Sequence, residues 1–134
     1  MKFAKYVFLV AGIYGLFVTF PLFFLEAKLS VDYPPALNHP EYYYSFASVT
    51  LVWQILFLFI SREPVKFRPV MLFCCLEKLS LLPALVALLP RSLVPQNWFP
   101  LMMIDLILGV LFVVSYIKTN DGRGVTEEVV SRVN

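Results

Sequence analysis

Charged residues are scarce in this chain of 134 residues. Asp, Glu, Lys and Arg together make up 15% of it, whereas 60% is hydrophobic and 16% is aromatic. A soluble globular domain carries about 25% charged residues and could not hide so much apolar surface. The formal net charge of +2 is too small to indicate a nucleic-acid partner. The composition therefore predicts an integral membrane protein of one domain, with the lipid bilayer as its main partner.

Residues that bind metals or act as nucleophiles are equally few. The only histidine is His39, and the carboxylates around it in the sequence are scattered, which is weak evidence for a metal site. Cys74 and Cys75 are adjacent rather than in a CxxC motif, so we interpret them as small buried residues. No Gly-rich phosphate loop, HExxH motif or plausible Ser-His-Asp set is present. We predict no metal and no cofactor.

Four stretches with few or no charges are long enough to cross a bilayer. A transmembrane helix needs about 20 apolar residues for a hydrocarbon core about 30 Å thick. The predicted spans lie at about residues 6–25, 42–61, 70–89 and 98–117. The first is too long for a secretory signal peptide. We therefore predict an all-α transmembrane four-helix bundle over residues 1–118, followed by a flexible cytoplasmic tail at 119–134.

Polar, proline-containing segments separate these spans. Residues 26–41 contain three prolines, which deny the segment a continuous helix and predict an ordered or semi-ordered outer loop. The short turn at 62–69 makes the second and third spans an antiparallel hairpin. Residues 90–97 form a tight second outer loop before the fourth span. The predicted bundle is therefore antiparallel throughout.

The positions of the Lys and Arg residues predict the orientation of the chain. Cytoplasmic segments of membrane proteins carry an excess of these residues. One side of the predicted bundle has eight of them and the other has two. The eight are Lys2, Lys5, Arg62, Lys66, Arg68, Lys118, Arg123 and Arg132, and the two are Lys28 and Arg91. We therefore expect both termini in the cytoplasm and the protein in the inner (plasma) membrane.

Three ionisable side chains, Glu77, Lys78 and Asp105, and the amide of Gln54 fall inside the predicted spans. A charge near the bilayer centre costs about 2.5–3.5 kcal/mol, so such residues are expected to be paired or functional. With a rise of about 1.5 Å per residue, Gln54 and Glu77 lie at similar depth, and we expect a hydrogen bond between them. Lys78 points elsewhere, and its long stem reaches toward Asp105 as an ion pair. The sequence leaves open whether this set is a structural network or a functional site.

Small and polar residues recur at helical spacing in every span and predict the faces that pack together. Small residues let membrane helices approach closely. The predicted packing face consists of Gly12, Gly15, Thr19, Ala47, Thr50, Gln54, Cys74, Glu77, Ser80, Ala84, Ala87, Met102, Asp105, Gly109 and Tyr116.

Several motifs resemble those of a group of small uncharacterised bacterial four-span membrane proteins. The motifs are HPEYYY at His39–Tyr44, WQ at Trp53-Gln54, REPVKFRP at Arg62–Pro69, LEK at Leu76–Lys78 and DLILGVLF at Asp105–Phe112. The resemblance covers most of the chain. It implies four spans and a membrane location, and it brings no activity with it.

The layout also resembles that of the EXPERA proteins, which include the sigma-2 receptor and the emopamil-binding sterol isomerases. These have a four-span core, a proline-bearing loop after the first span and a short basic turn before the third. The resemblance implies that Gln54 falls where the family tends to place a polar or acidic residue, and that Glu77 lies near the interior polar cluster of the family. The acid and histidine arrangement of the isomerases has no recognisable counterpart in this sequence.

Three functional hypotheses follow from these observations. The first is a non-enzymatic membrane protein whose interior site, built from Gln54, Glu77, Lys78 and Asp105, binds a small hydrophobic or lipid-like molecule or docks another membrane protein. The second is an EXPERA-like lipid isomerase, with Glu77 as proton donor or acceptor and Asp105 as its electrostatic partner. The third is a proton or ion pathway, which normally needs a longer chain of polar residues than this one.

Overall fold

The computed structural model describes residues 2–32, 38–91 and 98–133, and of Arg91 and residues 121–133 it describes the backbone. Over these residues the chain is all-α. The helices are α1 (Lys2–Thr19), α2 (Leu22–Asp32), α3 (Pro40–Arg62), α4 (Arg68–Leu79), α5 (Leu81–Leu88), the 3-10 helix η1 (Leu89–Arg91) and α6 (Phe99–Val133).

Four helical segments are long and apolar enough to cross a membrane. They are Lys2–Thr19, Pro40–Arg62, Arg68–Leu88, which joins α4 and α5, and Phe99–Asn120, the first part of α6. This confirms the predicted all-α, four-span architecture and makes the chain a multi-pass membrane protein. The orientation of the termini, the choice of membrane and the division of the chain at residue 118 stay predictions.

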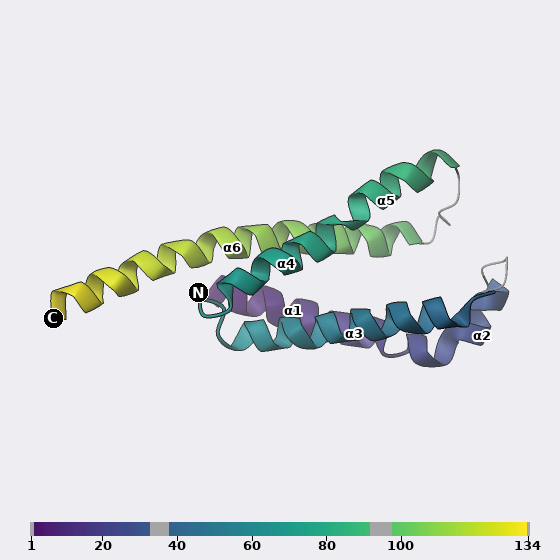
Figure 1. Ribbon diagram of the computed structural model, residues 1–134, viewed down its shortest axis with the longest axis horizontal. Coiled ribbons are helices and arrows are strands. Elements are labelled where there is room, and N and C mark those ends of the chain that lie inside the picture. The colour runs from purple at the N-terminus through teal and green to yellow at the C-terminus, as the bar shows by residue number, and fades with distance from the viewer. Residues whose placement is uncertain (1, 33–37, 92–97, 134) are drawn as a thin grey trace.

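The four spans run antiparallel between two ends of the bundle (Figure 1). We call the end that carries Lys2, Arg62, Arg68 and Lys118 the basic end. At the opposite end, which we call the open end, α1 stops at Thr19 and α6 begins at Phe99.

The spans form two helical hairpins. α1 packs along α3, and α4 packs on α6, while contacts between α1 and α6 and between α3 and α4 join the two pairs. Figure 1 shows the hairpins meeting toward the basic end and diverging toward the open end. Within the described part of the chain, α5 packs only against α4 and η1. The third span therefore leaves the bundle over its second half.

The half of the bundle toward the basic end has a closely packed apolar core. The rings of Phe8 and Phe112 stack with their centroids 4.3 Å apart, and the ring of Phe57 meets Phe112 edge-on at 4.9 Å. All three side chains are fully buried. They come from α1, α3 and α6, so one aromatic cluster links the two hairpins. Stacked and edge-to-face aromatic pairs contribute about 0.5–1.5 kcal/mol beyond their burial.

The predicted first span is interrupted at Pro21. α1 ends at Thr19, Phe20 donates to the carbonyl of Leu16, and the next helix begins at Leu22. Proline has no N–H to continue the hydrogen-bond ladder, and it ends or bends a helix there. α2 then extends to Asp32 and α3 begins at Pro40, so the prediction that residues 26–41 form a loop is wrong for residues 26–32 and 40–41. Residues 33–37 lie outside the described part of the chain.

The third span also changes direction, between α4 and α5. Ser80 lies between the two helices, and Pro83 cannot donate a hydrogen bond to the carbonyl of Leu79. The hydroxyl of Ser80 donates to the carbonyl of Glu77 at 2.8 Å. Beyond this break Ala84 and Ala87 are exposed, so their predicted place on a packing face is wrong. The packing face continues only as far as α4.

Candidate functional site

The divergence of the two hairpins leaves a cleft of about 650 Å³ between α3 on one side and α4, α5 and α6 on the other. Its walls are largely apolar and include Phe46, Val49, Trp53, Leu81, Leu101 and Met102. Its polar lining comes from the Ser45 and Thr50 hydroxyls and from Glu77, Lys78, Ser80 and Asp105. A cleft of this size falls in the range of ordinary ligand pockets, about 300–1,000 Å³.

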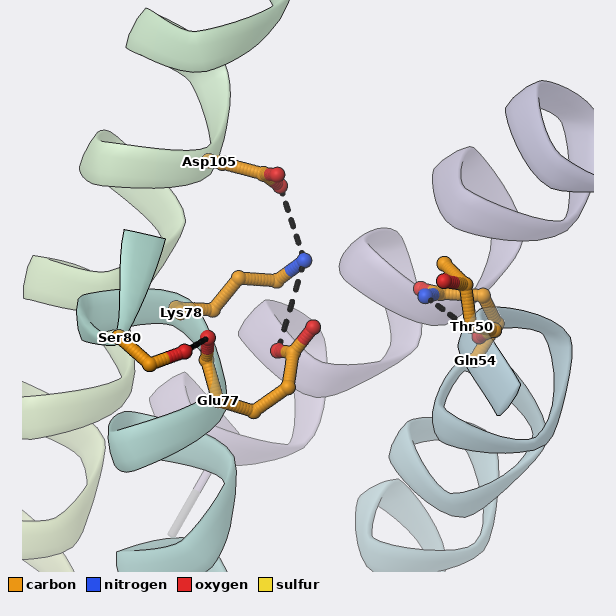
Figure 2. Close-up of polar contacts among 6 residues, drawn as sticks. All are labelled: Thr50, Gln54, Glu77, Lys78, Ser80 and Asp105. Carbon is orange, nitrogen blue, oxygen red and sulfur yellow. Dashed lines mark hydrogen bonds and ion pairs between the residues drawn. The ribbon is translucent and has the colours of Figure 1, made fainter. Parts of the chain in front are cut away.

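Lys78 forms the centre of the polar lining. Its side chain is only 7% exposed, and its Nζ donates a hydrogen bond of 2.8 Å to Oδ1 of Asp105 on α6. Figure 2 shows the ammonium held between two carboxylates, those of Asp105 and Glu77. The ring of Phe57 lies on a third side, with its centroid 5.6 Å from Nζ. The ion pair predicted between Lys78 and Asp105 is confirmed.

Glu77 has a different partner from the one predicted. Its Oε2 lies 3.6 Å from Nζ of Lys78, the next residue in the chain, and Figure 2 shows both side chains extending to the same side of α4. That oxygen is buried and accepts no hydrogen bond from any described residue. Neighbouring positions on a helix point about 100° apart, but the flexible stem of lysine overcomes this separation.

Gln54 does not reach Glu77, so the predicted hydrogen bond between them is wrong. The Gln54 side chain is buried, and its Nε2 donates to the carbonyl of Thr50 at 3.0 Å, as Figure 2 shows. The amide packs against α1 at Gly15, where a Cβ atom would overlap the amide oxygen. Gln54 thus fills a notch that the missing side chain of Gly15 creates.

A second, smaller cavity of about 110 Å³ lies on the α1 side of the ion pair. Its polar lining includes Tyr14, Thr50, Gln54, Lys78 and Asp105. Lys78 and Asp105 therefore border both cavities, whereas Glu77 lines only the cleft and Gln54 only the smaller cavity. The structure brings three of the four predicted site residues into one ionic cluster and places Gln54 behind it.

Two residues that shape the site were not predicted from the sequence to be part of it. Trp53 was noted only as part of a motif, and it lines the cleft beside Thr50. Gly109 was assigned to helix packing, but a Cβ atom there would lie 3.2 Å from Cβ of Lys78. Gly109 lies four residues after Asp105, hence on the same face of α6. That spacing could have marked Gly109 as the residue that lets α4 approach Asp105.

The three ionisable side chains form a cluster with more acceptors than donors. Two carboxyl groups face one ammonium, and Asp105 is 36% exposed while Glu77 is 21% exposed. Pairing lowers the cost of keeping charges within a membrane, because an unpaired charge is far more expensive there. Within the described ranges, no group of three or more His, Cys, Asp or Glu side chains could hold a metal ion.

Comparisons of the chain with protein families, curated proteins and solved structures gave no match. The function is therefore argued from the geometry of the cleft and its ionic cluster. The resemblances drawn from the sequence motifs stay predictions.

Proposed function

We propose that this protein binds a lipid-like amphiphile in the cleft between α3 and α4–α6. One observation carries the proposal: an apolar-walled cleft of about 650 Å³ has an ionic cluster at one place on its lining. A molecule with an apolar chain and a polar headgroup fits a cleft of this kind. Its chain contacts the apolar walls in place of bilayer lipid, and its headgroup contacts the charged side chains of the ionic cluster. The acceptor-rich cluster suits a headgroup that donates hydrogen bonds.

Each charged residue has a different role in this proposal. Asp105 is the most exposed of the three and directs its carboxylate toward Lys78, so it can accept from the headgroup while holding the lysine. Lys78 is nearly buried and keeps the two carboxylates together. Glu77 offers the second acceptor on the cleft side. The same surface could instead receive a helix of a partner membrane protein, and the experiments below distinguish the two.

The packed half of the bundle weighs against a pathway for protons or ions. The stacked rings of Phe8, Phe57 and Phe112 fill the space between the ionic cluster and the basic end. A conducting route needs polar groups or water along its length, and these rings supply neither. A site that is accessible from one half of the bundle agrees better with binding than with conduction.

A lipid isomerase remains the second candidate, and one observation favours it. Oε2 of Glu77 is buried beside the cleft and accepts no hydrogen bond from any described residue, so its ion pair with Lys78, at 3.6 Å, leaves its hydrogen-bonding capacity free for a substrate. In this candidate Glu77 moves a proton to or from the substrate and Asp105 acts as its electrostatic partner. Incubation with isoprenoid lipids, followed by chromatography and mass spectrometry, should then give a product of unchanged mass that Glu77→Gln abolishes. Absence of any isomeric product would reject this candidate.

The binding proposal is tested by filling the cleft. Ala84 lines the cleft from α5 and is exposed, so Ala84→Trp should block the cleft without disturbing the packed core. Val86 lies on the same helix, is 70% exposed and is not part of the lining, which makes Val86→Trp the matched control. After purification and detergent exchange, mass spectrometry should show at least a fivefold loss of retained lipid for Ala84→Trp and no loss for Val86→Trp.

Charge variants complete the test. Asp105→Asn should reduce the retained lipid, whereas Glu63→Gln, in an exposed ion pair near the basic end, should leave it unchanged. Equal retention by wild type, Ala84→Trp and Asp105→Asn would refute amphiphile binding in the cleft. If the blocked variant instead loses a co-purifying membrane protein while its lipid content is unchanged, the cleft is a docking site for that partner.

A further inference from the structure

At the basic end of the bundle, four cations have no anionic partner among the side chains that the structure describes. Lys2, Lys5, Arg62 and Lys118 are all exposed, and none of them forms an ion pair with any described residue. The Lys118 ammonium lies 4.5 Å from the centroid of the Phe3 ring, which brings a cation of α6 next to α1. These four residues, from α1, α3 and α6, form what we call the cationic ring.

Other cations of the protein are already engaged. At the same end, Lys66 pairs with Glu63 at 3.3 Å, and Nε of Arg68 donates to the carbonyl of Tyr116 at 3.2 Å. At the open end, Lys28 pairs with Asp32. Among the side chains that the structure describes, the cations without an anionic partner therefore lie at one end of the bundle.

The cationic ring lies where the apolar spans reach the basic end. α1 begins at Lys2 and α3 ends at Arg62, and the contact of Lys118 with Phe3 brings α6 to the same level. On α1, within one helical turn of Lys2 and Lys5, the side chains of Phe3 and Tyr6 are 36% and 59% exposed. A bilayer places phosphate groups outside its apolar core, so this arrangement offers cations to phosphates and aromatic surface to acyl chains.

We propose that the cationic ring binds the headgroups of anionic phospholipids. The ligand is a phosphodiester with a net negative charge that is anchored in the bilayer by its acyl chains. The proposal follows from the unpaired charge and from the adjacent exposed aromatic side chains. It is independent of the function proposed for the cleft, which lies in the other half of the bundle.

The binding test compares phosphatidylglycerol with phosphatidylcholine, which has a zwitterionic headgroup. Short-chain forms of both lipids are titrated into the detergent-solubilised protein at low salt. Phosphatidylglycerol should bind at least fivefold more tightly, and this preference should shrink at 0.5 M salt, since screening weakens exposed charges. Glycerol phosphate, which lacks acyl chains, should not compete at the same concentration.

Single-lysine variants identify the residues responsible. Lys118→Gln should weaken phosphatidylglycerol binding about fivefold, which is the effect expected for one cation near an anionic surface. Lys66→Gln, which removes a paired lysine from the same end, should change the affinity less than twofold. Lys28→Gln provides the same change of charge at the open end and should also have little effect.

Two results would overturn the proposal. One is equal affinity for phosphatidylglycerol and phosphatidylcholine at low salt. The other is an equal loss of affinity for Lys118→Gln, Lys66→Gln and Lys28→Gln, which would show that only the net charge of the protein matters. Because all three lysines are exposed on the surface, each variant should fold, and its unfolding midpoint in detergent serves as the control.

Discussion

The two halves of this bundle are built from the same helices but have different interiors. Toward the basic end, aromatic and small side chains from α1, α3, α4 and α6 fill the space between the hairpins. Toward the open end the hairpins separate, and the space between them holds an ionic cluster and a cleft. Packing in one half holds the helices together, which leaves the other half free to present polar groups without carrying the fold.

The largest expected effect comes from removing an aromatic ring of the packed half. Phe112→Ala should lower the free energy of unfolding by about 3–5 kcal/mol, because a fully buried ring leaves a cavity. Phe46, which lines the cleft and is 59% exposed, is the control, and Phe46→Ala should cost less than about 1 kcal/mol. Chemical unfolding in detergent measures both. Similar losses would contradict the division of the bundle into two halves.

Removing the cation of the ionic cluster should have the next largest effect. Lys78→Met leaves two carboxyl groups without their ammonium, and breaking a buried ion pair costs about 3–5 kcal/mol. Because Asp105 is partly exposed, we expect a smaller loss of about 2–3 kcal/mol. Lys66→Met, which breaks the exposed pair with Glu63, should cost less than about 1 kcal/mol. If both variants unfold alike, the cluster contributes no more than a surface ion pair.

A third prediction concerns the contact between Gly15 and Gln54. Gly15→Ala should cost about 1–3 kcal/mol, since the new Cβ atom overlaps the Gln54 amide and forces it out of its notch. Adding Gln54→Ala removes the overlap, so the double variant should be more stable than Gly15→Ala alone. The coupling energy, obtained from unfolding of the two single variants and the double variant, should be about 1–2 kcal/mol. Additive effects would show that the two residues do not interact.

The smallest effect is expected in α5. Pro83→Ala restores an N–H that can bond the carbonyl of Leu79, yet α5 packs only on α4 and η1 among the described residues. The free energy of unfolding should therefore change by less than about 0.5 kcal/mol. Spin labels on α5 and α3 should nevertheless report a changed distance as the third span straightens. A loss above about 1 kcal/mol would mean that α5 belongs to the packed structure.

The spans and the central ion pair could be predicted from the sequence because both depend on local information. A charge-free stretch of about 20 residues is sufficient evidence for a span. The Lys78–Asp105 pair followed from the cost of isolated charges and the reach of a lysine side chain. The second argument also assumes that the third and fourth spans are neighbours, which the short segment between them makes the natural expectation.

The orientation of Gln54 could not be predicted in the same way. The helical rise gives the depth of a residue but not the neighbour that its side chain faces. Gln54 turns toward α1 because Gly15 has no side chain and leaves room for the amide. This space is defined only when α1 and α3 are packed together, so the sequence of α3 alone does not indicate it. The break at Pro21 was not predicted, because the first span was expected to be continuous over about residues 6–25, and membrane helices tolerate proline when neighbouring groups satisfy the freed carbonyls.

Because the two hairpins are held together at the basic end, a small rotation of one hairpin there displaces its open end by a larger distance. The aromatic cluster holds the two hairpins together toward the basic end, and within the α4–α6 hairpin the guanidinium of Arg68 lies 4.0 Å from the ring centroid of Tyr116. α3 has 23 residues and is therefore about 35 Å long. A rotation of about 5° at the fixed end moves its far end by about 3 Å. Bilayers of different thickness tilt membrane helices differently, so we expect the width of the cleft to vary with the thickness of the membrane around it.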